Sequence, residues 1–343
     1  PSERGLIARG NRALHRKRRT MRRYLVTGVA GFIGANVAAA LLRAGHEVVG
    51  VDNINDYYDP LLKHYRLRPL LTESNFSFVE TDLADAHATQ ALFSDRPFNV
   101  VIHLAAQAGV RYSLQNPGAY VQSNLVGFQH VIDACCAHPP EHLVFASSSS
   151  VYGNSDREWL SESDATDQPV SLYAATKKSN EVVAHTVAHL YQLPTTGLRF
   201  FTVYGPAGRP DMAYFSFTQA ILAGSPIRVF NHGHLERDFT YIDDIVAGVL
   251  AVAEAPPTEL STPFRLLNLG NHEPVSLGDF IATLERLLGK EANKQFVEMQ
   301  PGDVHRTAAN IEAARSLVGF NPSPSLRSRL DQFVAWYREY YRG

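Results

Sequence analysis

The segment TGVAGFIG, residues 27–34, constrains the fold more strongly than any other part of the sequence. A run of apolar residues typical of a buried strand precedes it, and the pattern that follows is helical. Gly28 permits a tight turn, Gly31 lets the backbone approach a pyrophosphate, and Gly34 lets the helix pack closely on the strand. The start of the helix adds free N–H groups and the positive end of the helix dipole. The segment therefore predicts a dinucleotide site, and a turn that serves packing alone is the less favoured interpretation.

Acidic and small residues at the ends of later strands fit the same interpretation. Asp52 ends the second expected strand about 20 residues after the turn, where a carboxylate accepts hydrogen bonds from the adenosine ribose and repels a 2′-phosphate. We therefore expect NAD rather than NADP as the cofactor. Asp82 and Leu83 end the third strand, where a carboxylate can hold the adenine amino group, and the small residues 104–106 end the fourth.

Strand and helix patterns alternate from Arg23 onward. Runs rich in β-branched and aromatic residues occur at 24–28, 47–52, 76–80, 99–106 and 142–149, and helical patterns at 31–44, 117–137 and 171–190. This alternation predicts an α/β fold, a Rossmann-type doubly wound parallel sheet with right-handed crossovers. Beyond about residue 200, Gly-Pro-rich segments and shorter elements predict a smaller mixed α/β C-terminal substrate lobe. We therefore expect a basic arm at 1–22, an NAD-binding Rossmann domain at 23–200, and a lobe at 201–343 that is interleaved with late Rossmann elements.

The segment SLYAATK, residues 171–177, predicts the catalytic groups. Tyr173 and Lys177 are four residues apart and share one face of a helix. A free phenol is a poor base near neutral pH, but a neighbouring ammonium group and the positive nicotinamide ring lower the pKa of a tyrosine. Ser148, at the end of the fifth strand, is expected to bond the same substrate oxygen. A tyrosine and lysine at this spacing are common on helices, so the prediction depends on the upstream glycine turn.

Together these motifs resemble the extended short-chain dehydrogenases/reductases, and more narrowly the UDP-glucuronate 4-epimerases. The resemblance runs from about Arg23 to the C-terminal helix. The segments that carry the narrower resemblance are DNINDYYDPLLK (52–63), QAGVRYSLQNP (107–117), SLYAATKKSNE (171–181), TTGLRFFTVYGPAGRPDMA (195–213) and RDFTYIDDI (237–245).

The resemblance implies an NAD-dependent epimerase that converts UDP-glucuronate to UDP-galacturonate through a 4-keto intermediate. It implies that the catalytic residues are Ser148, Tyr173 and Lys177. The expected cofactor contacts are Gly28, Gly31, Phe32, Ile33, Gly34, Asp52, Asn53, Asp82, Leu83, Leu104, Ala105, Ala106, Asn124, Tyr173 and Lys177. The expected substrate contacts are Arg111, Ser148, Ser149, Tyr173, Thr202, Arg209, Arg237 and Asp303, with Arg237 near the diphosphate and Asp303 near the uridine ribose.

Arg209 carries the argument for a uronic acid substrate. Its planar guanidinium group matches a carboxylate with two parallel hydrogen bonds, so an arginine facing C6 of the sugar selects glucuronate over glucose. Thr202 stands where many UDP-galactose 4-epimerases carry asparagine. Without the resemblance, a surface arginine in a Gly-Pro loop is the simpler interpretation.

Short segments of the sequence bear on three alternative activities, which are dehydration, decarboxylation and epimerisation of UDP-glucose. Related dehydratases carry an Asp-Glu pair where this chain has Ser149 and Ser150, and related UDP-glucuronate decarboxylases carry glutamate there, so both are disfavoured. UDP-glucose/UDP-galactose 4-epimerisation is the closer alternative. A catalytically idle nucleotide sensor is disfavoured because the Ser-Tyr-Lys set is intact.

Charge, hydropathy and the histidine and cysteine positions limit the classes of binding partner that we expect. A net charge of −2 gives no reason to expect a nucleic-acid partner. No apolar run is long enough to predict a membrane span. We expect no metal, because His185 and His189 lack a third ligand. The adjacent Cys135 and Cys136 indicate reduced thiols in a cytoplasmic protein. The resemblance further implies a homodimer that pairs the helices at 117–137 and 171–190.

Overall fold

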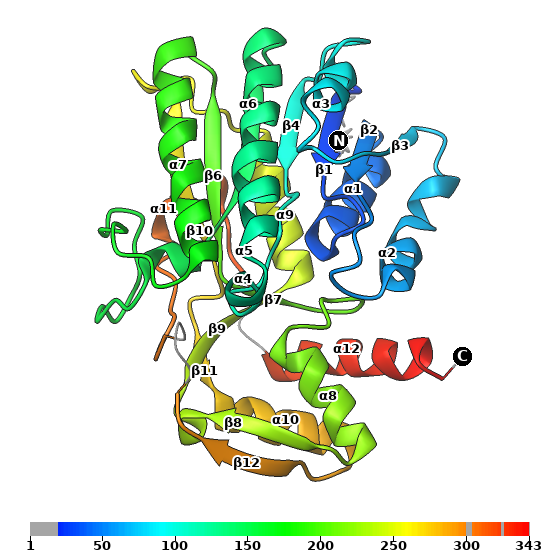
Figure 1. Cartoon of the computed structure of the whole chain (residues 1–343), viewed down its shortest axis with the longest axis vertical. Helices are drawn as coiled ribbons and strands as arrows, with labels where there is room; N and C mark the ends of the chain where they lie inside the picture. Colours follow the sequence, from blue (N-terminus) through cyan, green and yellow to red (C-terminus); the bar gives the residue numbers. More distant parts are fainter. Residues whose placement is uncertain (1–19, 300–303, 324–325, 343) are drawn as a thin grey trace, which may run out of the picture.

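The computed structural model describes residues 20–299, 304–323 and 326–342. Its centre is a parallel seven-stranded sheet in the order β10-β6-β5-β4-β1-β2-β3 (Figure 1). The strands are β1 (Arg23–Thr27), β2 (Glu47–Asp52), β3 (Phe76–Glu80), β4 (Val100–His103), β5 (His142–Ser148), β6 (Thr195–Phe200) and β10 (Phe264–Leu269). The Rossmann-type α/β prediction is confirmed. The strand order reverses between β1 and β4, and the carboxyl ends on either side of such a reversal form a crevice.

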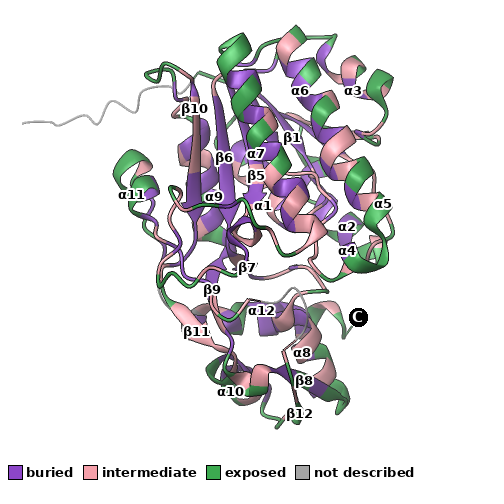
Figure 2. Cartoon of the chain, turned by 60° about the vertical axis from the view of Figure 1, so that its left-hand side comes forward, coloured by how far each residue is buried: buried purple, intermediate pink, exposed green. Residues whose placement is uncertain are grey.

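Helices cover both faces of this sheet because alternate strand residues are apolar on each side (Figures 1 and 2). On one face, Tyr24 and Val26 belong to a core that includes helices α1 and α9. On the other face, Leu25 belongs to a second core that includes α3, α6 and α7. The bounds of these five helices are α1 (Phe32–Arg43), α3 (Ala86–Phe93), α6 (Gly127–Ala137), α7 (Leu172–Tyr191) and α9 (Ile242–Ala253).

The helix predicted at 117–137 is interrupted. It consists of α5 (Pro117–Tyr120), a π-helical segment (Val121–Val126) and α6. Such wider turns are rare and occur mostly near functional sites. Strand β4 is also shorter than predicted, so residues 104–106 lie in the loop after it rather than in the strand.

The smaller lobe lies beyond the carboxyl ends of the sheet strands (Figure 1). Within it, β8 (Pro226–Phe230) and β12 (Asn293–Val297) form a parallel pair. A three-stranded sheet of β11 (Pro274–Ser276), β9 (Glu236–Tyr241) and β7 (Thr202–Tyr204) connects it to the main body.

The other helices of the described chain are α2 (Pro60–Leu67), α4 (Tyr112–Gln115), α8 (Ala213–Ala223), α10 (Leu277–Leu288), α11 (Glu312–Val318) and α12 (Leu326–Tyr340), with short 3₁₀ turns at Leu70–Thr72, Ser149–Tyr152 and Asn231–Gly233.

Two late elements, β10 and α9, belong to the sheet layer rather than to the lobe. The chain therefore crosses between the two parts more than once after residue 200. Most of the expected basic arm, residues 1–19, lies outside the described residues. Within the described part of the chain, no helix is both long enough and apolar enough to cross a bilayer.

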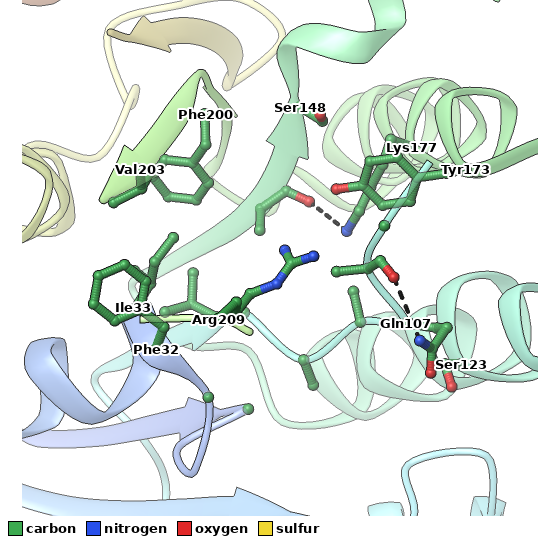
Figure 3. Close-up of a pocket in the computed structure, with 18 of the residues that line it drawn as sticks. Phe32, Ile33, Gln107, Ser123, Ser148, Tyr173, Lys177, Phe200, Val203 and Arg209 are labelled. Atoms are coloured by element: carbon green, nitrogen blue, oxygen red, sulfur yellow. Dashed lines mark hydrogen bonds between the residues drawn. The ribbon is translucent and has the colours of Figure 1, made fainter. Parts of the chain in front are cut away.

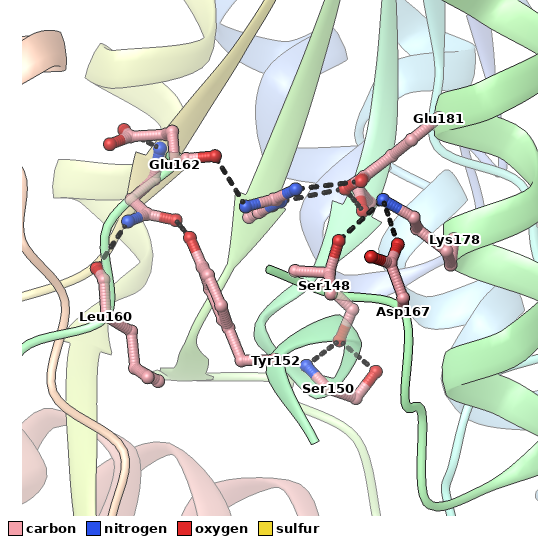
Figure 4. Close-up of polar contacts among 12 residues, drawn as sticks. Ser148, Ser150, Tyr152, Leu160, Glu162, Asp167, Lys178 and Glu181 are labelled. Carbon is pink, nitrogen blue, oxygen red and sulfur yellow. Dashed lines mark hydrogen bonds and ion pairs between the residues drawn. The ribbon is translucent and has the colours of Figure 1, made fainter. Parts of the chain in front are cut away.

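A buried ion pair fixes helix α7 against the sheet (Figure 4). The carboxylate of Glu181 accepts hydrogen bonds from Nε and Nη2 of Arg199 on β6, at 2.8 and 2.9 Å. It also accepts one from the hydroxyl of Ser147 on β5, at 2.6 Å. Removing one partner of a pair this deeply buried destabilises a protein by about 3–5 kcal/mol. The pair therefore fixes the position of the helix that carries Tyr173 and Lys177 relative to the strand that ends at Ser148.

Candidate active site

One cavity of about 410 Å³ lies at the carboxyl ends of the sheet strands, between the sheet and the smaller lobe. Figure 3 shows that side chains from both parts point into it. The expected site residues that line it are Gly28, Gly31, Phe32, Ile33, Gly34, Asp52, Asn53, Asp82, Leu83, Leu104, Ala105, Ala106, Ser148, Ser149, Tyr173, Lys177, Thr202, Arg209 and Arg237. The fold therefore brings together residues that are up to about 210 positions apart in the sequence.

The glycine turn is packed too tightly for any side chain. Gly28 has a φ of +69°, and a Cβ there would lie 2.8 Å from the backbone nitrogen of Ala105. A Cβ on Gly34 would lie 2.1 Å from the carbonyl oxygen of Gly28. Helix α1 begins with no side-chain cap and no acidic residue in its first turn. Its first N–H groups thus face the cavity without a competing anion, which fits the pyrophosphate of a dinucleotide.

The carboxylate of Asp52 is held by the backbone around it. One oxygen accepts from the N–H of Ala30 at 3.1 Å, and the other from the N–H of Ile54 at 2.9 Å. Each oxygen keeps a lone pair that can accept from a ribose hydroxyl. The buried ammonium group of Lys63, which the sequence analysis did not assign to the site, lies 4.0 Å from the same carboxylate. This donor and acceptor set fits the adenosine half of NAD.

Lys177 is directed toward the sheet. Its ammonium group donates to the carbonyl of Ala146 on β5 at 2.9 Å (Figure 3). Burial lowers the pKa of Lys177 to about 8. Lys177 is therefore charged at neutral pH, but less favourably than in water.

The phenol of Tyr173 lies among groups that shift its pKa in opposite directions. Burial raises the pKa of its phenol, and the largest opposing influences are Arg209 and a hydrogen bond with the hydroxyl of Ser148. The ammonium group of Lys177 bonds the carbonyl of Ala146, and its expected effect on the pKa of Tyr173, together with that of the nicotinamide ring, stays a prediction. Arg209, in the loop after β7, thus places a further cation near this phenol.

Ser148 is positioned by the turn that follows it. Its hydroxyl oxygen accepts from the N–H of Ser150 at 3.2 Å and from the hydroxyl of Ser150 at 3.0 Å. Its own proton is therefore available for an oxygen in the cavity. Ser149 and Ser150 begin the short 3₁₀ turn that follows the strand, so the cavity wall carries hydroxyl groups where related dehydratases carry carboxylates.

Arg209, the residue predicted to select a uronic acid, lies in the same cavity as these groups. Its guanidinium group points into the cavity (Figure 3) and forms an ion pair with Asp211. Thr202 lines the cavity from the start of β7. Arg237 lies at the lobe end of the cavity, and its Nη1 donates to the carbonyls of Glu236 and His305.

Two expected contacts do not lie on the cavity wall, and a third lies outside the described residues. Arg111 precedes the short helix α4, and its guanidinium group lies 4.8 Å from the ring centre of Phe230 instead. The buried amide of Asn124 bonds the backbone N–H and carbonyl of Gln107 at 2.8 and 3.0 Å, so it supports the wall from behind. Asp303 lies outside the described residues.

Several residues that line the cavity were not assigned from the sequence. They are mainly apolar or aromatic and include Tyr57, Tyr58, Gln107, Phe200, Phe201, Met212 and Thr307. The only signal for the first two was the DNINDYYDPLLK segment, of which only Asp52 and Asn53 had been interpreted. Among the described residues, no group of His, Cys, Asp or Glu is arranged to hold a metal ion.

Comparison with known proteins identifies one group of relatives. The NAD dependent epimerase/dehydratase family matches residues 24–270. UDP-glucuronate 4-epimerase 4 of Arabidopsis thaliana is 50% identical over 332 residues, which are 93% of this chain and 76% of that protein. A probable UDP-glucuronate 4-epimerase of Rhizobium meliloti is 46% identical over 334 residues, 93% of this chain and 98% of that one.

Solved structures agree with these relatives. The crystal structure of UDP-glucuronic acid 4-epimerase from Bacillus cereus, in complex with UDP-glucuronic acid and NAD, superimposes with a TM-score of 0.86 at 35% sequence identity. The match covers 93% of this chain and 100% of the other.

The buried ammonium group of Lys177 generates a prediction about stability. The pKa of about 8 lies below the usual 10.5, so at pH 7 the folded protein bears a burial penalty of about 3 kcal/mol. We expect Lys177→Met to raise the free energy of unfolding at pH 7 by roughly 1–2 kcal/mol, because the lost hydrogen bond to Ala146 offsets part of the gain. Between pH 8 and 10.5 the unfolded chain binds more protons than the folded one, so the wild type becomes more stable and the gain shrinks.

Urea unfolding at several pH values measures this difference. Lys290→Met is the matched control, because Lys290 also donates to a backbone carbonyl, that of Leu222 at 2.8 Å, but at an exposed position. The control should change stability by less than about 1 kcal/mol at every pH. A gain for Lys177→Met that does not vary with pH would contradict the prediction.

Proposed function

This chain belongs to the NAD dependent epimerase/dehydratase family, and we propose that it interconverts UDP-glucuronate and UDP-galacturonate by epimerisation at C4. The observation that carries the proposal is the position of Arg209. Its guanidinium group shares one cavity with Ser148, Tyr173, Lys177 and the glycine turn. A cation beside the catalytic hydroxyls supports a sugar that carries a carboxylate. The relatives named UDP-glucuronate 4-epimerase support the same substrate.

The cofactor supplies a reversible hydride acceptor for C4 of the sugar. The residues proposed to hold it are those of the glycine turn for the pyrophosphate, Asp52 for the adenosine ribose, and Asp82 for the adenine. Their donor and acceptor pattern supports NAD, and the Bacillus cereus relative is described in complex with NAD.

Tyr173 is proposed to transfer the proton on O4 of the sugar, and Ser148 to bond the same oxygen. The phenol takes this proton when C4 is oxidised and gives it back when C4 is reduced. The Ser148 hydroxyl accepts two bonds from Ser150, so its own proton can be donated to the same oxygen when the sugar is bound. The positive charge of Arg209 lowers the pKa of Tyr173 against the effect of burial, which favours the proton transfer.

The substrate imposes a further requirement on the site. A 4-ketouronic acid is a β-keto acid and loses CO₂ when its C5–C6 bond aligns with the carbonyl π system. The keto sugar must also turn over in the cavity so that C4 is reduced on its opposite face. We propose that Arg209 and Thr202 hold the carboxylate out of this alignment. Arg237 is proposed to bind the diphosphate, and Asp303 the uridine ribose.

The alternative activities have less support. Epimerisation of UDP-glucose gives no role to a cation in the sugar region of the cavity. Related dehydratases and UDP-glucuronate decarboxylases carry carboxylates beside the catalytic serine, where the structure has the hydroxyls of Ser149 and Ser150.

Assembly as a homodimer through α6 and α7 is also proposed. Exposed apolar side chains follow the outer face of α7, with Val182, Leu190 and Tyr191 exposed by 54%, 66% and 64% (Figure 2). They surround a shallow hollow that is also lined by Cys136 on α6. Exposed apolar groups on neighbouring helices support burial against a second copy. The unpaired thiols of Cys135 and Cys136 support a location in the cytoplasm.

Light scattering after size exclusion tests the dimer. We expect Val182→Glu/Leu190→Glu to give a monomer at micromolar concentration, because it would bury two charges in the interface. Leu71→Glu is the control, since Leu71 is 58% exposed and lies outside this face. A dimer that persists in the α7 variant would contradict the proposed interface.

Proton NMR of the protein with UDP-glucuronate and a trace of NAD⁺ tests the activity. We expect UDP-galacturonate, seen as the collapse of the large H3–H4 and H4–H5 couplings. Formation of a decarboxylated pentose instead would contradict the interpretation of Ser149 and Ser150. Conversion of UDP-glucose alone would contradict the role of Arg209.

A further inference from the structure

The segment after β2 reaches across the cavity to the loop that carries Arg209. The hydroxyl of Tyr57 donates to Oδ2 of Asp211 at 3.2 Å. The Asp211 carboxylate in turn accepts from both Nε and Nη2 of Arg209, with a distance of 3.0 Å from Nε to Oδ1. Tyr57, Asp211 and Arg209 thus form a chain of hydrogen bonds in which only the last member had an assigned role.

The backbone of the Arg209 loop is fixed separately from this chain. The buried guanidinium group of Arg66, on α2, donates to the carbonyls of Ala207 and Gly208 at 2.8 and 2.9 Å. The N–H of Arg209 itself donates to the hydroxyl of Tyr214 at 3.1 Å. With the backbone held, the direction of the Arg209 guanidinium group depends on the partner of its side chain, which is Asp211.

Asp211 leaves part of the guanidinium group available. It occupies the edge formed by Nε and Nη2. The guanidinium group points into the cavity (Figure 3), so the other edge, which includes Nη1, is left for a ligand there. A planar guanidinium group can bind one carboxylate on each of two edges. Asp211 therefore orients Arg209 without blocking it for a carboxylate on the sugar.

Tyr57 is held in place by its surroundings. Its ring packs against Tyr112 with 4.7 Å between ring centres. Gly109, whose φ is +99°, leaves the space for the phenol, because a Cβ there would lie 2.6 Å from the Tyr57 hydroxyl.

The protonation states match this arrangement. Burial and the charge of Asp211 raise the pKa of Tyr57, so the phenol keeps its proton as a donor. Burial alone would raise the pKa of Asp211, but the Arg209 guanidinium holds it below its usual value, so the carboxylate stays charged.

We propose that Asp211 and Tyr57 are positioning residues that aim Arg209 at the sugar carboxylate, and so determine both the preference for a uronic acid and the retention of its carboxylate. This inference rests on the proposed function. If Arg209 loses its direction, the carboxylate of the 4-keto sugar can rotate. The C5–C6 bond then breaks, its electron pair forms the C4–C5 enolate with the charge on O4, CO₂ leaves, and protonation at C5 gives a UDP-4-keto-pentose.

Asp211→Asn and Tyr57→Phe test the proposal through product ratios. Carbon NMR with UDP-[6-¹³C]glucuronate measures labelled CO₂ against labelled UDP-galacturonate. We expect this ratio to rise roughly tenfold or more in Asp211→Asn and several-fold in Tyr57→Phe, as for the loss of one hydrogen bond to a charged group. Asp211→Glu should recover part of the wild-type ratio. Tyr112→Phe removes a neighbouring phenol that has no bond to Asp211, and should leave the ratio unchanged.

Binding measurements provide a second readout that does not depend on turnover. In a Tyr173→Phe background, calorimetry compares the affinities for UDP-glucuronate, UDP-glucose and UDP. We expect Asp211→Asn to reduce the preference for UDP-glucuronate over UDP-glucose by roughly tenfold, with UDP affinity unchanged. Unchanged product ratios and an unchanged preference, with UDP binding intact, would overturn the inference, and so would equal losses for both sugars.

Failure of the proposed function and failure of the inference give different results. If the wild type forms no UDP-galacturonate, the proposed function is wrong, whereas the affinity preference and its loss in Asp211→Asn still decide the role of the Tyr57–Asp211 pair. If the wild type epimerises but the variants behave as it does, only the inference is wrong.

Discussion

The parallel arrangement of the seven strands is the constraint on which the rest of the structure depends. Parallel strands direct all their carboxyl ends to one edge of the sheet, and the reversal of strand order between β1 and β4 opens a crevice there. The loops after β1, β2 and β4, the serine run after β5, and the chain that enters the lobe after β6 all meet at this edge. The chemistry of the cavity therefore follows from residues placed just after strand ends, although they are distant in the sequence.

Buried charged side chains then fix these loops relative to one another. Arg66 is one of these, since its Nη1 donates to the carbonyl of Ala30 in the glycine turn, while Nε and Nη2 hold the loop before Arg209. The Glu181–Arg199 pair does the same for α7 and β5. Such groups contribute little net stability when compared with apolar side chains of similar volume, but they define one arrangement among several. In this protein they keep the cofactor side and the sugar side of the cavity in a fixed geometry.

The parts of the site that could be predicted from the sequence are those that depend on local backbone geometry. The glycine turn, Asp52 and the Tyr173–Lys177 pair each lie within one element or directly after a strand, so spacing alone locates them. The structure differs from the sequence-based expectations where a side chain has several possible partners. The ammonium group of Lys177 bonds the carbonyl of Ala146, the amide of Asn124 bonds Gln107, and Arg111 lies over the ring of Phe230. The contact between Tyr57 and Asp211 joins residues 154 positions apart, and no local pattern encodes it.

A double-label experiment determines whether C4 is oxidised and reduced again within this one cavity. UDP-[4-²H]glucuronate and UDP-[¹³C₆]glucuronate are incubated together with the protein, and the UDP-galacturonate formed is analysed by mass spectrometry. We expect deuterium to stay on the unlabelled carbon skeleton of the product, because the hydrogen removed from C4 returns to the same sugar. Loss of deuterium to water, or its appearance on the ¹³C-labelled product, would contradict the account.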